Sequence, residues 1–318
     1  MRAVRIEGAG EVAVRDVPEP VGGAGDVVVH VRAVAACGTD LRMTRLGSHA
    51  PRIPGHEIVG TLDDGTLVGV QPNLGCGACD ACRAGRENRC AAKVDIGIQR
   101  DGGFAERVAV PAAHVVPLGE MPVLAAPQLE SLACVLHAVD QLAVADGEPA
   151  VVIGAGAIGV LAAWAMRSRG ARVAVIQRSE GRRATARGLD VGAVLSPDDD
   201  VEAALGAPPA AAFVAAGGAE PLTWALERVA IGGRVHAFAG TPGGASVDAN
   251  LVHYRHLTLL GSTGSTVADY LRGLELARSG AVPIERLPTR EVAFDEMPAV
   301  LRGERTDPSV LKYVTVPG

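Results

Sequence analysis

The sequence predicts an α/β protein with two domains, an antiparallel, barrel-like β domain and a doubly wound parallel sheet. Its 318 residues, of which 48% are hydrophobic, are enough for two packed cores. Near Pro127, short β-like runs separated by Gly and Pro give way to strands and helices that alternate about every 20 residues. The later strands are continuously apolar, which is typical of a parallel sheet covered on both faces.

Runs typical of strands fill the first 116 residues. The run Val27–Val34 is β-branched and partly alternating, as a half-buried strand requires. The other runs, short and bounded by Gly or Pro, are Val12–Val14, Ile58–Thr61, Val68–Val70 and Glu106–Val110. We expect them to form the antiparallel domain.

The second half of the chain alternates strands with helices. The expected strands are Ala150–Gly154, Arg172–Gln177, Ala193–Ser196, Ala211–Ala216, Gly233–Ala239 and Leu257–Gly261. The expected helices are Ala157–Arg169, Glu180–Leu189, Val201–Leu205 and Glu220–Val229. A further helix, Val267–Arg278, and strand-like runs at Glu291–Phe294 and Val310–Val316 return to the first domain. We therefore expect one domain from residues 1–131 and 264–318, and the doubly wound domain from residues 132–263.

Charge and composition exclude several classes of function. The formal net charge is −6 without a basic stripe, and aromatic residues make up 3% of the chain, so nucleic acid is not an expected partner. No secretory signal pattern opens the sequence, and we expect a cytoplasmic protein. The 18 residues Pro149–Met166 carry no charge, but their three glycines favour a buried strand, turn and helix over a membrane span.

A dinucleotide site is predicted where Val151-Val152-Ile153 leads into Gly154-x-Gly156-x-x-Gly159 and a helix. In that pattern the glycines allow a tight turn, close approach of a pyrophosphate, and tight packing of the helix on the strand. Ala157 and Ile158 open the helix, whose free N–H groups and positive dipole end attract phosphate. The alternative is a glycine-rich turn in a core.

The end of the second strand bears on the choice of cofactor. Gln177 occupies the position where a carboxylate would bind the ribose 2′-hydroxyl of NAD. Side chains that could contact a 2′-phosphate follow it: Arg178, Ser179, Arg182 and Arg183. We therefore expect NADP to be favoured over NAD. The alternative is that these arginines form the solvated start of a helix.

Four of the six cysteines form a closely spaced set, Cys76-x2-Cys79-x2-Cys82-x7-Cys90. Four thiolates on one short loop can complete a tetrahedron around zinc, and such a closed site is structural. An iron–sulfur cluster also uses four cysteines, but nothing else in the sequence indicates electron transfer. We therefore expect a structural zinc lobe over residues 76–90.

A second group of metal-ligand types is Cys37-Gly-Thr39-Asp40 followed by Gly55-His56-Glu57. Three protein ligands leave a coordination position for water or substrate, as catalysis needs. On its own, one Cys and one His are more often a buried structural pair. The other motifs around them favour the catalytic interpretation.

Taken together, these motifs resemble the zinc-dependent medium-chain alcohol dehydrogenases over nearly the whole chain. The residues that carry the resemblance are Cys37-Gly-Thr-Asp, Gly55-His-Glu, the four-cysteine lobe, Asp101-Gly-Gly-Phe-Ala-Glu106, Glu130-Ser-Leu-Ala-Cys-Val-Leu-His137 and Gly154-x-Gly-x-x-Gly. The branch it most resembles is that of sorbitol, polyol and threonine dehydrogenases, because Glu130 stands where liver-type enzymes have a cysteine ligand. The resemblance implies a GroES-like catalytic domain and a Rossmann domain.

The resemblance also assigns roles to residues. It implies that Cys37 and His56 bind a catalytic zinc, with Glu57 or Glu130 completing the shell. Asp40 then accepts the other His56 N–H, and Thr39 passes on the proton of the alcohol. Lys312 falls where relatives often place a basic group near the cofactor phosphates.

Three departures from the family pattern are visible. Arg42 replaces a relay histidine, for which His49 is a candidate substitute, and Ser131 replaces the proline after Glu130. The connection Thr61–Val68 is about ten residues shorter than usual.

The resemblance implies a zinc-dependent oxidoreductase with two zinc ions per chain that transfers a hydride between NAD(P) and a secondary alcohol or ketone of a polyol, sugar or cyclitol. The alternatives are a threonine-type amino-alcohol dehydrogenase and, in a different class, a non-catalytic binding protein that keeps the fold. The expected partners are a small-molecule substrate and further copies of the chain, in a homodimer or homotetramer.

Overall fold

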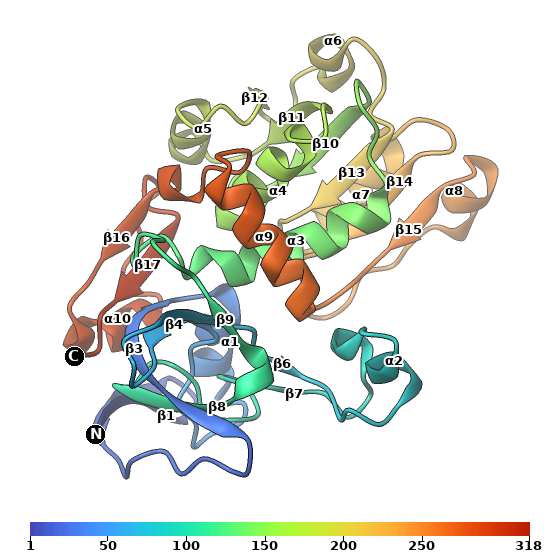
Figure 1. Ribbon diagram of the computed structural model, residues 1–318. Helices are drawn as coiled ribbons and strands as arrows, with labels where there is room; N and C mark the ends of the chain where they lie inside the picture. Colours follow the sequence, from blue (N-terminus) through green and yellow to red (C-terminus); the bar gives the residue numbers. More distant parts are fainter. The chain divides into compact units, whose positions relative to one another are not determined.

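The computed structural model describes residues 1–318, which divide into two compact units (Figure 1). Unit 1 comprises Met1–Ala133, Gly264–Arg278 and Pro288–Gly318, and unit 2 comprises Cys134–Thr263 and Ser279–Leu287. Helix α3, Gln128–Leu142, begins in unit 1 and ends in unit 2. None of the helices is long and apolar enough to span a membrane.

A mostly antiparallel sheet of seven strands forms the framework of unit 1. Its strands are β3 (Asp26–Ala35), β4 (Glu57–Thr61), β5 (Leu67–Val70), β8 (Arg107–Pro111), β9 (Val115–Pro117), β16 (Thr289–Glu291) and β17 (Lys312–Thr315). They follow the order β16-β17-β3-β4-β5-β9, with β8 also paired to β3. The β-branched run expected at Val27–Val34 is the long strand β3, which pairs with β4, β8 and β17.

Unit 1 has further elements outside this sheet. They are β1 (Arg2–Gly8), β2 (Glu11–Asp16), β6 (Asn73–Leu74), β7 (Val94–Asp95), α1 (Gly38–Leu46), α2 (Asp80–Arg83), α9 (Val267–Arg278), α10 (Met297–Leu301) and 3-10 turns at Glu87–Arg89, Ala112–His114 and Phe294–Glu296. The core includes Ile6 of β1, Val29 and Val31 of β3, and Phe104, all fully or almost fully buried.

One expectation in unit 1 is wrong. The run Glu291–Phe294 is not a strand, because β16 ends at Glu291 and Phe294 begins a 3-10 turn. A side-chain hydrogen bond favours the turn, since the Glu296 carboxylate accepts from the backbone N–H of Ala293 at 3.3 Å. The run Val310–Val316 does return to the first unit as β17.

Unit 2 is built on a six-stranded parallel sheet, which confirms the predicted doubly wound fold. The strands are β10 (Pro149–Ile153), β11 (Arg172–Ile176), β12 (Ala193–Leu195), β13 (Ala211–Val214), β14 (Arg234–Ala237) and β15 (Thr258–Leu260), in the order β12-β11-β10-β13-β14-β15. The helices are α4 (Ala157–Arg167), α5 (Glu180–Arg187), α6 (Val201–Leu205), α7 (Ala219–Arg228) and α8 (Ala249–Tyr254), with a 3-10 turn at Ile284–Arg286. The order reverses between β10 and β13, and ligands bind doubly wound sheets at such a point.

A buried histidine lies in the core of unit 2. His236 of β14 is stacked on Phe213 at 5.7 Å between ring centroids, and its Nε2 lies 3.1 Å from the Ser262 hydroxyl. Its Nδ1 has no hydrogen-bond partner. Burial, reinforced by the nearby His137, lowers the pKa of His236 to about 4. The imidazole is therefore neutral in the folded protein at neutral pH.

This histidine predicts acid sensitivity. The unfolded chain takes up the proton near pH 6.5 and the folded chain only near pH 4, so the contribution to stability is complete above pH 6.5 and is lost as the pH falls towards 4. Between pH 7 and 4.5 we expect wild type to lose about 2 kcal/mol more unfolding free energy than His236→Phe. Chemical denaturation at both pH values measures this difference, and equal losses in the two proteins would contradict it.

Candidate metal centres and cofactor site

Three predicted ligands meet at one point in unit 1. Cys37 immediately precedes α1, Glu57 is the first residue of β4, and His56 precedes it. Their candidate ligand atoms all lie within 4.8 Å of one another, and both His56 and Glu57 are buried. One Cys, one His and one carboxylate form a three-ligand set that leaves a coordination position open.

Asp40 connects the two backbone segments that carry these ligands. This fully buried residue lies in the first turn of α1, and its carboxylate accepts from the backbone N–H of Cys37 at 2.9 Å and from that of Gly55 at 3.1 Å. Its Oδ1 also lies 3.5 Å from His56 Nδ1, which is long for a hydrogen bond. The position suits the expected pairing with the imidazole and leaves His56 Nε2 for a metal.

Gly55, which precedes His56, has no room for a side chain. Gly55 has a φ of +93°, and a Cβ on it would lie 2.6 Å from Cδ2 of Phe104. Phe104 belongs to the motif Asp101-Gly-Gly-Phe-Ala-Glu106, so this motif packs directly against the ligand segment. This close packing fixes the backbone just before β4, and with it the positions of His56 and Glu57.

The two oxygens of Glu57 have different surroundings. Its Oε1 accepts from the ammonium of Lys312 and from the Ser131 hydroxyl, the latter at 2.8 Å. Its Oε2 is buried and has no hydrogen-bond partner. A buried carboxylate oxygen without a donor is costly, so it indicates a cation that completes the site.

The charges around Glu57 lead to the same conclusion. Burial disfavours the charged forms of His56 and Lys312, but nearby acidic groups outweigh it and raise the pKa of both. For His56 these groups are Asp40 and Cys37, and for Lys312 they are chiefly Glu57 and Cys37. The buried cluster therefore attracts cations. Its thiol, imidazole and carboxylate donors are the set that suits zinc.

Lys312, which the resemblance assigns to the surroundings of the cofactor phosphates, is buried in β17. Its ammonium lies against Glu57 and 3.4 Å from the Ser131 hydroxyl. An ammonium buried to this degree needs an anionic partner, and Glu57 supplies it.

The remaining predicted residues are not among the three ligands that come together. Glu130, buried in the first turn of α3, lies outside the group whose ligand atoms are within 4.8 Å. Thr39 is partly exposed in the first turn of α1, whereas Arg42 and His49 are exposed. His49 has a left-handed backbone with a φ of 62°.

Sequence reasoning missed Tyr270 of α9. This side chain is fully buried, and a Cβ on Gly69 would lie 2.0 Å from its hydroxyl, so Gly69 makes room for it. Burial and the charges of Glu130 and Glu57 raise the pKa of Tyr270, which stays protonated. No motif pointed to it, because it lies on a helix far along the chain from both glutamates.

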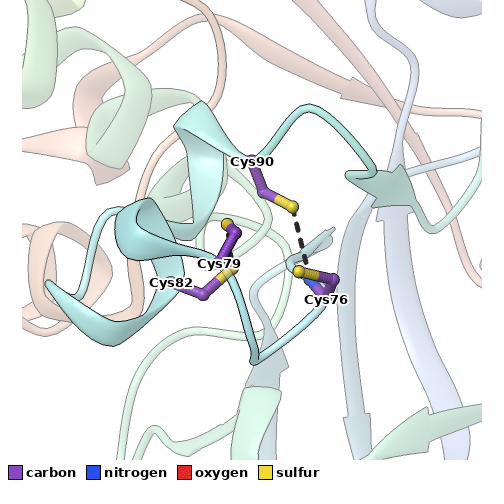
Figure 2. Close-up of side chains that lie close together, drawn as sticks. All are labelled: Cys76, Cys79, Cys82 and Cys90. Atoms are coloured by element: carbon purple, nitrogen blue, oxygen red, sulfur yellow. Dashed lines mark hydrogen bonds between the residues drawn. The ribbon is translucent and has the colours of Figure 1, made fainter.

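The four lobe cysteines come together as predicted (Figure 2). Their sulfur atoms all lie within 4.8 Å of one another, with Cys79 and Cys82 at 3.5 Å, and Cys90 Sγ accepts from the backbone N–H of Cys76 at 3.4 Å. Tetrahedral zinc with Zn–S bonds of about 2.3 Å places its sulfurs about 3.8 Å apart, close to this spacing.

Two of the lobe thiols differ in acidity. Hydrogen bonds from the backbone of Ala78 and Cys79 lower the pKa of Cys76 to about 6, so this thiol ionises at neutral pH. Desolvation raises the pKa of Cys82 to about 11. A metal that binds all four as thiolates therefore displaces a tightly held proton from Cys82.

In unit 2, the Gly-x-Gly-x-x-Gly segment joins β10 to α4 as predicted. A Cβ on Gly159 would lie 1.8 Å from the carbonyl oxygen of Gly154, so the helix could not pack here with any side chain. A Cβ on Gly156 would meet nothing within 4 Å, which leaves open space in front of the helix start. Ala157 and Ile158 form the first turn of α4, whose free N–H groups can bind phosphate.

Next to this turn lies a cavity of about 290 Å³ at the carboxyl ends of the strands. It is lined by Ile153, Gly154, Ile176, Gln177, Arg178, Pro197, Ala216, Gly217, Glu220, Pro221 and Trp224. Gln177 accepts from the backbone N–H of Ala155 at 3.1 Å, so its amide braces the glycine turn. The sequence analysis did not identify Glu220 and Trp224 as lining residues. Ligands bind doubly wound sheets beside the carboxyl ends of the strands, so the segment that follows β13 was a place to look for them.

The basic residues after β11 have separate roles. Arg178 is exposed and pairs with Glu220 at 3.4 Å. Arg183 turns inward and donates to the backbone carbonyls of Gln177 and Arg178, while the Ser179 hydroxyl accepts from the backbone N–H of Arg182 at the start of α5. Arg178 and Arg182 are therefore the basic side chains left to meet a phosphate.

Comparison with known proteins identifies both units. Residues 23–120 match the alcohol dehydrogenase GroES-like domain, and residues 157–279 match the zinc-binding dehydrogenases. A zinc-type alcohol dehydrogenase-like protein of Haemophilus influenzae is 30% identical over 95% of this chain and 94% of its own. D-altritol 5-dehydrogenase of Agrobacterium fabrum is 30% identical over 98% of each chain. A zinc-binding dehydrogenase of Sinorhizobium meliloti, solved with NADP bound, is 31% identical and has a TM-score of 0.91 over 99% of each chain.

The buried ion pair predicts a large effect of Lys312→Met. We expect it to lower the unfolding free energy by about 3 kcal/mol, because it leaves the buried Glu57 carboxylate without its cation. Ser131→Ala removes one neutral hydrogen-bond donor and is expected to cost about 1 kcal/mol. Chemical denaturation at pH 7 measures both losses. Adding Glu57→Gln to Lys312→Met is expected to recover at least half of the loss, and a double variant as unstable as Lys312→Met would contradict this account.

Proposed function

Because the chain belongs to the zinc-binding alcohol dehydrogenases, we propose that it transfers a hydride between NADP or NAD and a secondary alcohol or ketone of a polyol, sugar or cyclitol. The observation that carries this proposal is the cluster of Cys37, His56 and Glu57, with one buried carboxylate oxygen that has no partner. A non-catalytic protein that keeps the fold has no need of such an open, charged set.

In this proposal Cys37, His56 and Glu57 hold the catalytic zinc, and Glu130 is the alternative carboxylate ligand. Bound zinc supplies Lewis acidity, which lowers the pKa of an alcohol or polarises a ketone. Asp40 fixes the imidazole and the backbone of both ligand segments. Thr39, partly exposed two residues after Cys37, passes the alcohol proton outward. The guanidinium of Arg42 cannot act as a relay base at neutral pH, so His49 or solvent takes the proton.

A second, structural zinc is proposed for the lobe. Cys76, Cys79, Cys82 and Cys90 form a closed four-sulfur set with no position left for substrate. Metal binding is expected to hold this loop folded, because its regular structure consists of only the four-residue helix α2 and a 3-10 turn.

The cofactor is proposed to lie on the glycine turn and in the adjacent cavity, with NADP favoured over NAD. Gln177 carries no charge to repel a 2′-phosphate, Arg178 lies beside it in the cavity lining, and Arg182 follows in α5. Bound NADP supplies the carbon that accepts or donates the hydride. The NADP in the Sinorhizobium meliloti structure supports this choice.

We base the proposed substrate class on the relative that is named for a polyol, D-altritol. We propose a cytoplasmic location, for which closely spaced metal-binding thiols are typical, and assembly as a homodimer or homotetramer. Turnover of a panel of polyols, cyclitols and amino alcohols with both cofactors tests the substrate class. Fastest turnover of threonine would select the threonine-type alternative.

Cys37→Ala is expected to abolish turnover and to lower the zinc content from about two ions per chain to about one. Its melting temperature should stay close to that of wild type, because the lobe is intact. The matched variant Cys79→Ser should lose the other zinc and lower the melting temperature instead. Metal analysis, kinetics and thermal melts measure these outcomes, and near-wild-type activity in a zinc-depleted Cys37→Ala protein would refute the role of the cluster.

Arg178→Ala is expected to reduce the preference for NADP over NAD in kcat/KM by about two- to fivefold. The effect is smaller than that of a buried bidentate pair, because the Arg178 side chain is 79% exposed. Steady-state kinetics with both cofactors on wild type and variant measure it. A wild type that prefers NAD, or a variant with unchanged preference, would show that Arg178 does not set the choice.

A further inference from the structure

One wall of the cavity in unit 2 carries a charge that opposes the proposed cofactor preference. Glu220 lies in the first turn of α7, and its carboxylate is 3.4 Å from the guanidinium of Arg178. Both side chains line the cavity, and Gln177 lies beside Arg178. The guanidinium proposed to meet a 2′-phosphate therefore already has an anionic partner.

This ion pair contributes little to the fold. The two side chains are 79% and 78% exposed, and such pairs are worth about 0–1 kcal/mol. The same exposure lets a mobile phosphate reach Arg178 and replace the carboxylate. The pair is therefore placed to act on ligand binding more than on stability.

We propose that Glu220 is a specificity-determining residue, which weakens the binding of a 2′-phosphate by occupying Arg178. The inference rests on the proposed function, since it takes this cavity as the site of the adenosine part of the cofactor. A phosphate that binds Arg178 has to compete with the negatively charged Glu220 carboxylate for the guanidinium, whereas an uncharged ribose diol does not. Glu220 thus reduces the ratio of NADP affinity to NAD affinity, and NAD can still bind.

The cavity lining contains a tryptophan whose fluorescence can report the binding of a nucleotide. Trp224 lies four residues after Glu220 on α7, so both are on one face of the helix, and both line the cavity. The indole Nε1 of Trp224 donates to the Pro197 carbonyl at 3.3 Å, which holds the ring in place. The other tryptophan, Trp164, is buried in α4 away from the cavity lining and gives a constant background.

The test is a fluorescence titration of the zinc-loaded protein with adenosine 2′,5′-bisphosphate and with 5′-AMP, which need no turnover. Glu220→Gln is expected to tighten binding of the bisphosphate about three- to fivefold and to change binding of 5′-AMP less than about twofold. Glu227→Gln, which removes the same charge on the same helix outside the cavity lining, is the matched control and should change neither. Melting temperatures check that all variants are folded.

A double-variant cycle separates release of Arg178 from a general loss of negative charge. In the Arg178→Ala background, Glu220→Gln is expected to change bisphosphate binding less than about twofold. Nucleotides that bind with an unchanged ratio after Glu220→Gln, or an effect that persists without Arg178, would overturn the inference and leave the proposed function intact. Failure of both nucleotides to bind wild type would overturn the cavity assignment and the inference with it.

Discussion

Glu57 carries its charge at a place from which water is excluded, and much of unit 1 is arranged to make that possible. The residue is fully buried, its Oε1 is held by Lys312 and Ser131, and its Oε2 has no hydrogen-bond partner. A buried charge without compensation costs several kcal/mol, so each contact is a condition of folding as well as of chemistry. Asp40 and the glycine-rich packing on Phe104 then hold the neighbouring ligands around this carboxylate.

The parts that the sequence could predict are those in which neighbours along the chain are also neighbours in space. The glycine turn from β10 to α4 and the loop of four cysteines are continuous segments, so their spacing alone specifies their geometry. The parallel sheet could also be predicted, because strands buried on both faces are apolar along their whole length. The strand β1 was not predicted, because the charged residues Arg5 and Glu7 interrupt its short apolar run, although Val4 and Ile6 belong to the core.

What could not be predicted depends on pairs that lie far apart in the sequence. Lys312 and Glu57 are separated by 255 residues, and nothing in either local pattern indicates the ion pair. Glu220 lies 42 residues after Arg178, in helix α7, whereas Arg178 lies in the loop after β11. The two become neighbours because β11 and β13 flank β10 in the same sheet. Family resemblance placed a basic group at position 312, but the partner of that group depends on burial, which the sequence does not give.

The long separation between Glu57 and its cation also has a consequence for biosynthesis. A ribosome adds about 5–20 residues per second, so Lys312 follows Glu57 by about 10 to 50 seconds during translation. Throughout that interval the nascent β4 carries a carboxylate whose burial is not yet compensated by the ammonium. The ion pair beside the metal cluster therefore forms only after β17 has been synthesised and has paired with β3.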